Sequence, residues 1–214
     1  SKQMRHFLSI ADQPTEQLVK LLDLARDLKA EQKAIENKPL LQGKALGMIF
    51  QKPSLRTRVS FERGMAQLGG AALYLSPAEI KLGERESVPD VARVLSRYVD
   101  AIMARVFAHS DILTLAEYAT VPVINGLSDL SHPCQAMADV LTIREKLGGL
   151  KGAKLTYVGD GNNVCNSLLF AAAKLGMHMA VATPPGYEPD PAILAQARQF
   201  AAESGSQITT GNDP

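Results

Sequence analysis

Residues 45–58 read ALGMIFQKPSLRTR, an apolar run followed at once by a polar stretch rich in hydroxyl and guanidinium groups. The run Ala45–Phe50 predicts a buried strand, because it is short, apolar and bounded by polar residues. From Thr57 the apolar residues fall on one helical face, and the glycines at 69–70 close that helix. The sequence therefore places a polar turn between the carboxyl end of a buried strand and the start of a helix.

The same alternation of strand and helix extends in both directions from this turn. A helix is also expected from the cap Ser87 through Tyr98. Because strands separated by helices form parallel sheets covered on both faces, the pattern predicts an α/β fold with two such sheets. Further strands are predicted at residues 71–75, 101–106, 121–124, 154–158, 177–182 and 207–210, and further helices at 15–34, 111–119, 133–147, 164–175 and 191–203.

A glycine-rich stretch at residues 148–152 is the best candidate for a domain boundary. It divides the chain into a domain at 1–148 and a second unit at 149–214. That second unit has three predicted strands, roughly half of an ordinary doubly wound sheet. We expect the second domain to be incomplete and the natural chain to continue, because its sheet would otherwise keep an open edge.

Composition indicates a globular protein without a general attraction for polyanions. Hydrophobic residues make up 46% of the 214, and 23 basic residues against 22 acidic ones give a net charge of +1. Any anion-binding site must therefore be local. Cys134 and Cys165 lack CxxC spacing, which is typical of free thiols in a reducing compartment. With no apolar stretch near the ~20 residues that span a bilayer, we expect a soluble cytoplasmic protein.

The polar turn at residues 52–58 has the composition of a phosphate site. A helix N-terminus offers unpaired N–H groups and partial positive charge, and Ser54 and Thr57 add hydroxyl groups. Arg56 can pair with two phosphate oxygens at once. An ordinary capped helix with two solvated arginines explains the same stretch equally well, so this turn alone leaves both interpretations open.

A second polar segment, SHPCQ at residues 131–135, starts the helix that follows another predicted strand. Arg105 lies at the end of the predicted strand 101–106. A guanidinium at the end of an apolar strand is costly unless it meets an anion or a carbonyl dipole. Open α/β sheets bind ligands at the carboxyl ends of their strands. Arg56, Arg105, His132 and Gln135 therefore suit a small molecule with both a phosphate and a carbonyl group, although a lone histidine at such a turn is often only a cap.

The stretch PSLRTRVSFE at residues 53–62, followed by HPCQ at 132–135, resembles the paired signature of the aspartate and ornithine carbamoyltransferases. The resemblance covers essentially the whole chain and implies a carbamoyl-phosphate site without a metal or an organic cofactor. Leu55 stands where the family commonly has Thr, which removes one hydroxyl donor and keeps the main-chain N–H. The resemblance assigns the phosphate to Ser54, Leu55, Arg56 and Thr57. It assigns the carbamoyl oxygen to Arg105, His132 and Thr57, and the carbamoyl NH2 group to Gln135. Lys81, Pro133 and Cys134 complete the residues that it assigns to carbamoyl phosphate.

The segment VGDGNNVCNS at residues 158–167 is similar to that of the ornithine-type members. Asn166 matches a residue that binds the backbone groups of the amino acid. No cation stands at Asn162, Asn163 or Asn166, so a second carboxylate, as in aspartate, would lack a partner. The resemblance therefore implies carbamoyl transfer to L-ornithine, giving L-citrulline for arginine biosynthesis or the related catabolic pathway. It also implies a homotrimer or a higher multiple of one.

Several alternatives remain open from the sequence. The turn Gly159-Asp160-Gly161 resembles a dinucleotide fingerprint, but Val164 occupies the third glycine position, so a nicotinamide-dependent enzyme is a distant alternative. Acetylornithine, putrescine or aspartate could be the acceptor, and the chain could be an inactive carbamoyl-phosphate-binding module or a structural assembly domain. The family's Ser-Met-Gly and His-Cys-Leu-Pro segments do not occur here, so we expect this chain alone to be inactive.

Overall fold

The structure is a computed structural model that describes residues 5–214. It divides into two compact units. The first combines the described residues up to Leu8 with Leu24–Asp129, and the second combines Ser9–Asp23 with Leu130–Pro214. Helix α1 (Thr15–Lys33) therefore contributes to both. Within residues 5–214, no helix is both long and apolar enough to cross a membrane.

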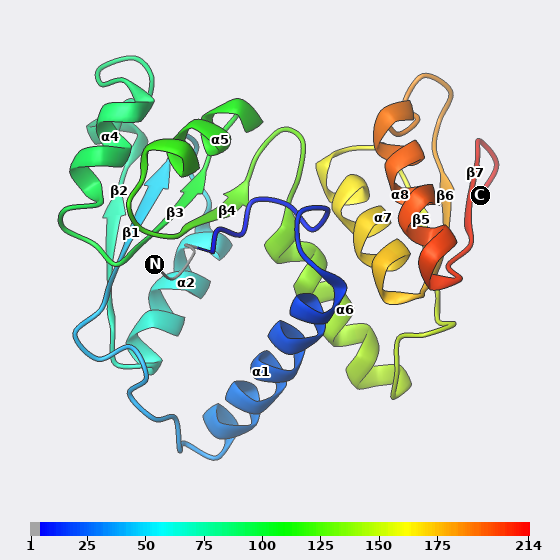
Figure 1. Cartoon of the computed structure of the whole chain (residues 1–214), viewed down its shortest axis with the longest axis horizontal. Coiled ribbons are helices and arrows are strands. Elements are labelled where there is room, and N and C mark those ends of the chain that lie inside the picture. The colour runs from blue at the N-terminus through cyan, green and yellow to red at the C-terminus, as the bar shows by residue number, and fades with distance from the viewer. Residues whose placement is uncertain (1–4) are drawn as a thin grey trace. The chain divides into compact units, whose positions relative to one another are not determined.

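The first unit is built on a four-stranded parallel sheet with the order β2-β1-β3-β4 (Figure 1). Strands β1 and β3 form its centre, with Leu46 opposite Ala101 and Phe50 opposite Arg105. This register brings the carboxyl ends of β1 and β3 side by side, which places the residues after each strand at one edge of the sheet. The strands are β1 (Ala45–Phe50), β2 (Ala71–Leu75), β3 (Ala101–Arg105) and β4 (Val123–Leu127).

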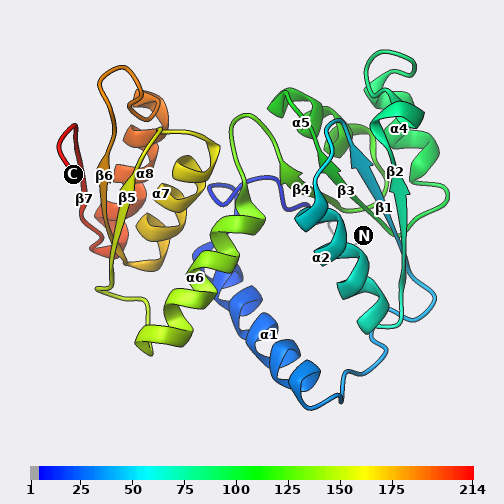
Figure 2. The ribbon, with the colours of Figure 1, turned by 180° about the vertical axis from the view of Figure 1, so that it is seen from behind.

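Helices cover both faces of this sheet (Figures 1 and 2). On one face Met48, Phe50 and Met103 are fully buried against apolar side chains of α2 (Leu55–Gln67). On the other face Ile49 and Ile102 pack with residues of α4 (Val88–Leu95) and α5 (His109–Tyr118). A single helical turn, α3 (Pro77–Ile80), follows β2.

The second unit has a three-stranded parallel sheet of order β5-β6-β7 and three helices of its own. Helix α7 is its centre, with every residue from 165 to 173 buried. The residues of β5 alternate, and Lys154, Thr156 and Val158 are exposed. Its elements are α6 (Pro133–Leu147), β5 (Lys154–Val158), α7 (Asn163–Leu175), β6 (His178–Ala182), α8 (Pro191–Ser204) and β7 (Ile208–Gly211).

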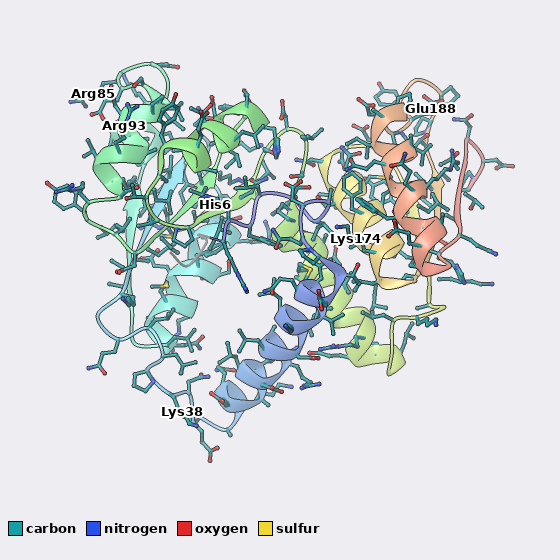
Figure 3. All side chains as sticks on the ribbon, in the orientation of Figure 1. His6, Lys38, Arg85, Arg93, Lys174 and Glu188 are labelled. Carbon is teal, nitrogen blue, oxygen red and sulfur yellow. The ribbon has the colours of Figure 1, made fainter. Side chains whose placement is uncertain are left out.

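The segment that precedes α1 is held to the second unit by a lysine on α7, Lys174, which is labelled in Figure 3. The ammonium group of Lys174 donates to the carbonyls of Ala11 at 2.7 Å and Gln13 at 2.5 Å, and it lies 4.4 Å from the centre of the Phe200 ring. Carbonyl dipoles and an aromatic face together compensate for the partly desolvated charge. Burial accordingly lowers the pKa of Lys174 from its ordinary value.

The predicted α/β fold with parallel sheets flanked by helices is confirmed. Strands β1, β2 and β5 and helix α6 have the predicted bounds, whereas helix α3 was not expected. Helix α4 ends at Leu95 and does not reach Tyr98, whose ring fitted the helical period although it is 78% exposed. Strand β4 ends at Leu127, later than predicted. The prediction followed apolar residues only and therefore missed the part of the strand that contains Asn and Gly.

Candidate active site

The polar turn after β1 forms the capped start of helix α2. Ser54 is the N-cap, with extended backbone (φ −156°, ψ 114°), and its hydroxyl accepts from the N–H of Thr57 at 3.4 Å. No acidic side chain lies in the first turn, so the partial positive charge of the helix start is not neutralised from within. Leu55 and Arg56 are exposed there, with Leu55 76% accessible. The main-chain and side-chain donors of this turn are thus open to an anion.

Arg105, at the end of β3, reaches the same turn. Its Nη1 donates to the hydroxyl oxygen of Thr57 at 3.2 Å, while its buried Nε has no hydrogen-bond partner. The register with β4 shifts between Ala104 and Arg105, which marks a bulge at this point. Burial lowers the pKa of Arg105 from its ordinary value, yet a guanidinium stays protonated. A buried N–H without a partner costs about 1–3 kcal/mol, which an anionic or carbonyl ligand would offset.

The second arginine of the turn, Arg58, packs against the sheet. Arg58 forms an ion pair with Glu62 at 3.1 Å on α2. Its guanidinium also lies 3.7 Å from the centre of the Tyr74 ring on β2, and that ring packs against Phe50. These contacts fix the first turns of α2 against the sheet, which leaves Arg56 as the arginine available to a ligand.

Lys81 lies in the loop after α3. This loop is anchored by Gln51, which sequence reasoning missed. Lys81 itself is exposed in a left-handed conformation (φ 39°) as the C-cap of α3. The anchor is Gln51, whose Nε2 donates to the carbonyl of Leu82 at 3.3 Å and to the Asp111 carboxylate at 3.4 Å. Its Oε1 accepts from the N–H of Phe107 at 2.7 Å. Gln51 therefore ties together the segments that follow β1, β2 and β3.

In the second unit, helix α6 follows His132, an N-cap residue that supplies no side-chain capping bond. The backbone of His132 (φ −135°, ψ 71°) is not that of a usual N-cap, and its side chain makes no capping bond. Its main-chain N–H donates instead to the hydroxyl oxygen of Ser167 on α7, at 2.9 Å. Pro133 is buried at the first helical position. Sequence reasoning missed Ser167, because no local pattern links it to a residue so distant in the chain.

Gln135 is oriented by its neighbour one helical turn later. Its Nε2 donates to the Asp139 carboxylate at 2.9 Å, and the side chain of Gln135 is exposed. This bond assigns the amide nitrogen, so Oε1 is the atom left to accept from a ligand. Cys134, between Pro133 and Gln135, is a half-buried thiol, and burial raises its pKa to about 12.

Asn166 lies in the first turns of α7 and is almost fully buried, with 6% of its surface exposed. Its Nδ2 donates to the carbonyl of Leu130 at 3.0 Å, and its Oδ1 has no hydrogen-bond partner. The helix is capped by Asn162, whose side chain accepts from Val164 at 3.1 Å and Cys165 at 3.2 Å. The unpartnered atom of Asn166 is an acceptor, so it suits an N–H or ammonium donor.

The glycine turn before α7 has a packing explanation. The N–H of Gly161 donates to the carbonyl of Tyr187 at 2.8 Å, and a Cβ at Gly161 would lie 2.4 Å from the nitrogen of Pro189. Gly159 has φ 149°, a conformation that favours glycine. Both glycines are therefore required by the local backbone, without reference to a dinucleotide.

The structure thus brings the predicted residues together in two sets. Ser54, Leu55, Arg56, Thr57 and Arg105 share one edge of the first unit, with Lys81 in a loop of the same unit. The residues 132–135 and Asn166 belong to the second unit. Among residues 5–214, no group of three or more His, Cys, Asp or Glu side chains could hold a metal ion.

The anion-binding turn on a parallel sheet, with an unsatisfied arginine beside it, agrees with family models that match almost the whole chain. Residues 5–145 match the model described as "Aspartate/ornithine carbamoyltransferase, carbamoyl-P binding domain". Residues 151–214 match the model described as "Aspartate/ornithine carbamoyltransferase, Asp/Orn binding domain". The chain belongs to the aspartate/ornithine carbamoyltransferase family.

Within that family, the chain is similar to several ornithine carbamoyltransferases. The chain is 56% identical to the enzyme of Anoxybacillus flavithermus and 57% to that of Pyrococcus horikoshii, over 98% of its length. The structure of the Pyrococcus furiosus enzyme is 57% identical and superposes with a TM-score of 0.97, covering 98% of this chain and 67% of that one. The chain spans about two thirds of the length of these relatives, 67% and 66% for the first two.

Proposed function

We propose that the protein transfers the carbamoyl group of carbamoyl phosphate to the side-chain amine of L-ornithine, giving L-citrulline and phosphate. The observation that carries the proposal is the bond from Arg105 to Thr57 together with the unpartnered, buried Nε of Arg105. This arrangement lies beside a helix start that suits a phosphate. The ornithine carbamoyltransferases that the chain resembles support ornithine as the acceptor.

In this proposal the first turn of α2 holds the phosphate. The main-chain N–H groups of the turn, including that of Leu55, and the hydroxyl groups of Ser54 and Thr57 donate to its oxygens. Arg56, exposed and without an acidic neighbour in the turn, adds a guanidinium that can pair with two oxygens. The same contacts stabilise the phosphate as it leaves.

Arg105 acts on the carbonyl group. The neutral amine of ornithine attacks the carbamoyl carbon, and negative charge builds on the carbonyl oxygen. The bond to the phosphate oxygen then breaks, and the nitrogen gives a proton to the departing phosphate. Donors that are already in place where charge develops lower the barrier. Arg105 and Thr57 supply them from the first unit, since the guanidinium is already directed toward Thr57.

The residues of the second unit complete the assignment. His132 is proposed to donate to the carbamoyl oxygen, and the Oε1 of Gln135, set by Asp139, to accept from the carbamoyl NH2 group. We also propose that Lys81, Pro133 and Cys134 contribute to the carbamoyl-phosphate site. The unpartnered Oδ1 of Asn166 is suited to accept from the amino group of the acceptor amino acid.

We further propose that the protein acts as a homotrimer in the cytoplasm. Support for the location comes from Cys134 and Cys165, neither of which forms a disulfide, as a reducing compartment favours. The proposed division into a carbamoyl-phosphate domain at residues 1–148 and an ornithine-binding part at 149–214 accompanies this assignment. Sedimentation of the purified chain measures the oligomeric state, and a monomer at micromolar concentration would contradict the trimer.

Calorimetric titration of the chain with carbamoyl phosphate tests the donor site. Arg56→Ala should weaken binding at least about tenfold, because a charged hydrogen bond contributes roughly 1.5–3 kcal/mol. Arg63→Ala is the matched control, since Arg63 is an exposed arginine later on the same helix, and it should bind as the parent does. Unchanged affinity in Arg56→Ala would show that α2 does not hold the donor.

A further inference from the structure

Two hydrogen bonds connect the start of α7 to the segment that leads into α6. The N–H of His132 donates to Ser167 Oγ at 2.9 Å, and Asn166 Nδ2 donates to the carbonyl of Leu130 at 3.0 Å. The two α7 residues are buried, at 0% exposure for Ser167 and 6% for Asn166. We refer to Asn166 and Ser167 with these two bonds as the α7 clasp. All four residues belong to the second unit.

The clasp meets a need that the local sequence does not. Ser131, before the helix, is 2% exposed, and Pro133, after His132, carries no N–H. A buried main-chain N–H must find an acceptor, and His132 itself provides no side-chain capping bond to order this turn. Ser167 is that acceptor. Without its hydroxyl, the N–H of His132 would lose its partner on α7 between two buried neighbours, Ser131 and Pro133.

We infer that Ser167 is a positioning residue for His132. By fixing the main chain of His132 to the core helix α7, it sets the origin and direction of the imidazole that the proposed function assigns to the carbamoyl oxygen, so this inference rests on that function. Helix α7 is the most deeply buried element of its unit, with residues 165–173 all buried, and is therefore a rigid support.

The clasp also gives the two substrates a common support. Adjacent residues of α7 hold the donor-side His132 and present the unpartnered Oδ1 of Asn166, which the proposed function assigns to the acceptor. The Nδ2 atom of the same amide donates to the carbonyl of Leu130. An amino-acid substrate that binds Asn166 and shifts it would therefore also shift the segment that carries His132. Binding of the second substrate is thereby linked to the position of a group that acts on the first.

Ser167→Ala in the full chain tests the inference, with Ser204→Ala as the matched control. Ser204 is another hydroxyl of the second unit, bonded to the carbonyl of Ala173, and has no link to His132. The first readout needs no ligand: it is the imidazole NMR signal of His132, one of four histidines, assigned with His132→Gln. In Ser167→Ala this signal should shift and broaden, and the amides of the first turn of α6 should exchange at least about tenfold faster. Ser204→Ala should leave both unchanged.

The second readout is the affinity for carbamoyl phosphate. Ser167→Ala should weaken it up to about tenfold, because this is the largest effect that the loss of one hydrogen bond to the main chain usually has. Ser167→Cys keeps the size of the side chain and offers only a weak hydrogen-bond acceptor. Its affinity for carbamoyl phosphate should lie between those of the parent and Ser167→Ala. An unshifted His132 signal in Ser167→Ala overturns the inference. If the parent and Arg56→Ala bind the donor equally, the proposed function fails, and the His132 signal still decides whether the clasp positions this residue.

Discussion

Helices α2 and α6 both begin at proposed site residues, but their first turns are held by partners at very different distances along the chain. In α2, Ser54 caps a main-chain N–H three residues later, at Thr57. In α6, the N–H of His132 is bound by Ser167, which follows 35 residues later. A cap within one turn can be recognised in the sequence. A cap supplied by another helix can only be found once the fold is known.

The difference also determines what each serine holds in place. A serine that caps its own helix, as at Ser54, satisfies the backbone wherever the helix goes. A serine on a neighbouring helix, as at Ser167, satisfies the backbone and in addition ties the helix start to a rigid element. We expect the loss of the Ser54 hydroxyl to lower the stability of the helix start as well as phosphate binding, and the loss of the Ser167 hydroxyl to appear mainly as a displaced His132.

The largest expected effect concerns the thiols in the first turns of α6 and α7. A helix N-terminus lowers the pKa of a cysteine, so position alone would make Cys134 and Cys165 reactive. Burial has the opposite effect and raises the pKa of each to about 12. At pH 8 the thiolate population should therefore be roughly a thousandfold below that of an ordinary thiol of pKa ~8.5.

Reaction with an aromatic disulfide reagent at pH 8 measures this effect. The folded chain should react slowly and the urea-unfolded chain at the rate of a free thiol. Cys134→Ser and Cys165→Ser, each leaving one thiol, show which helix start is protected. Rapid reaction of either folded variant would mean that the partial charge of the helix outweighs burial at that site.

A second prediction sharpens the contrast at α2. Ser54→Ala should lower the free energy of unfolding of the chain by about 1 kcal/mol, because the N–H of Thr57 loses its acceptor at the helix start. Ser54→Gly should cost only a few tenths of that amount, since glycine leaves the helix start open to water. Urea denaturation followed by circular dichroism measures both. An unchanged free energy of unfolding in Ser54→Ala would show that the hydroxyl of Ser54 does not stabilise the helix start.

Much of the fold follows from local patterns in the sequence. The short runs that became β1, β2 and β5 are bounded clearly enough in the sequence to fix their ends, and Pro133 marks the start of α6. Where the pattern misled, tertiary contact decided. Tyr98 looked helical and is exposed, and β4 extends over Asn125 and Gly126 because Asn125 is fully buried and bonded to Leu8 and Ser128.

The candidate site divides in the same way. Ser54, Arg56 and Thr57 could be recognised because they stand together between a strand and a helix. Arg105 could be recognised because a charge ends an apolar strand, and its bond to Thr57 spans 48 residues. Gln51 and Ser167 carried no such mark. Each is a single polar residue whose partners, at separations of 31 to 60 residues for Gln51, are defined by the fold alone.

The smallest expected effect lies at a long-range contact in the first unit, between His6 and β4. The Nδ1 atom of His6, labelled in Figure 3, accepts from the N–H of Val123 at 2.9 Å, across 117 residues. Burial lowers the pKa of His6 below its ordinary value of 6.5. Between those two pKa values the unfolded chain binds more protons than the folded one, so stability rises with pH there and is lost as the pH falls through the folded pKa.

We therefore expect the urea midpoint of the parent to fall more between pH 7.5 and pH 5.5 than that of His6→Gln. The glutamine amide keeps an oxygen that can accept from Val123 and does not titrate in this range, so the difference between the two midpoints isolates His6 from other groups. A parallel fall in both proteins would mean that protonation of His6 leaves the bond to β4 intact. A larger fall in the parent would show that a contact invisible in the local sequence gives this strand a pH dependence, as Ser167 gives α6 a fixed start.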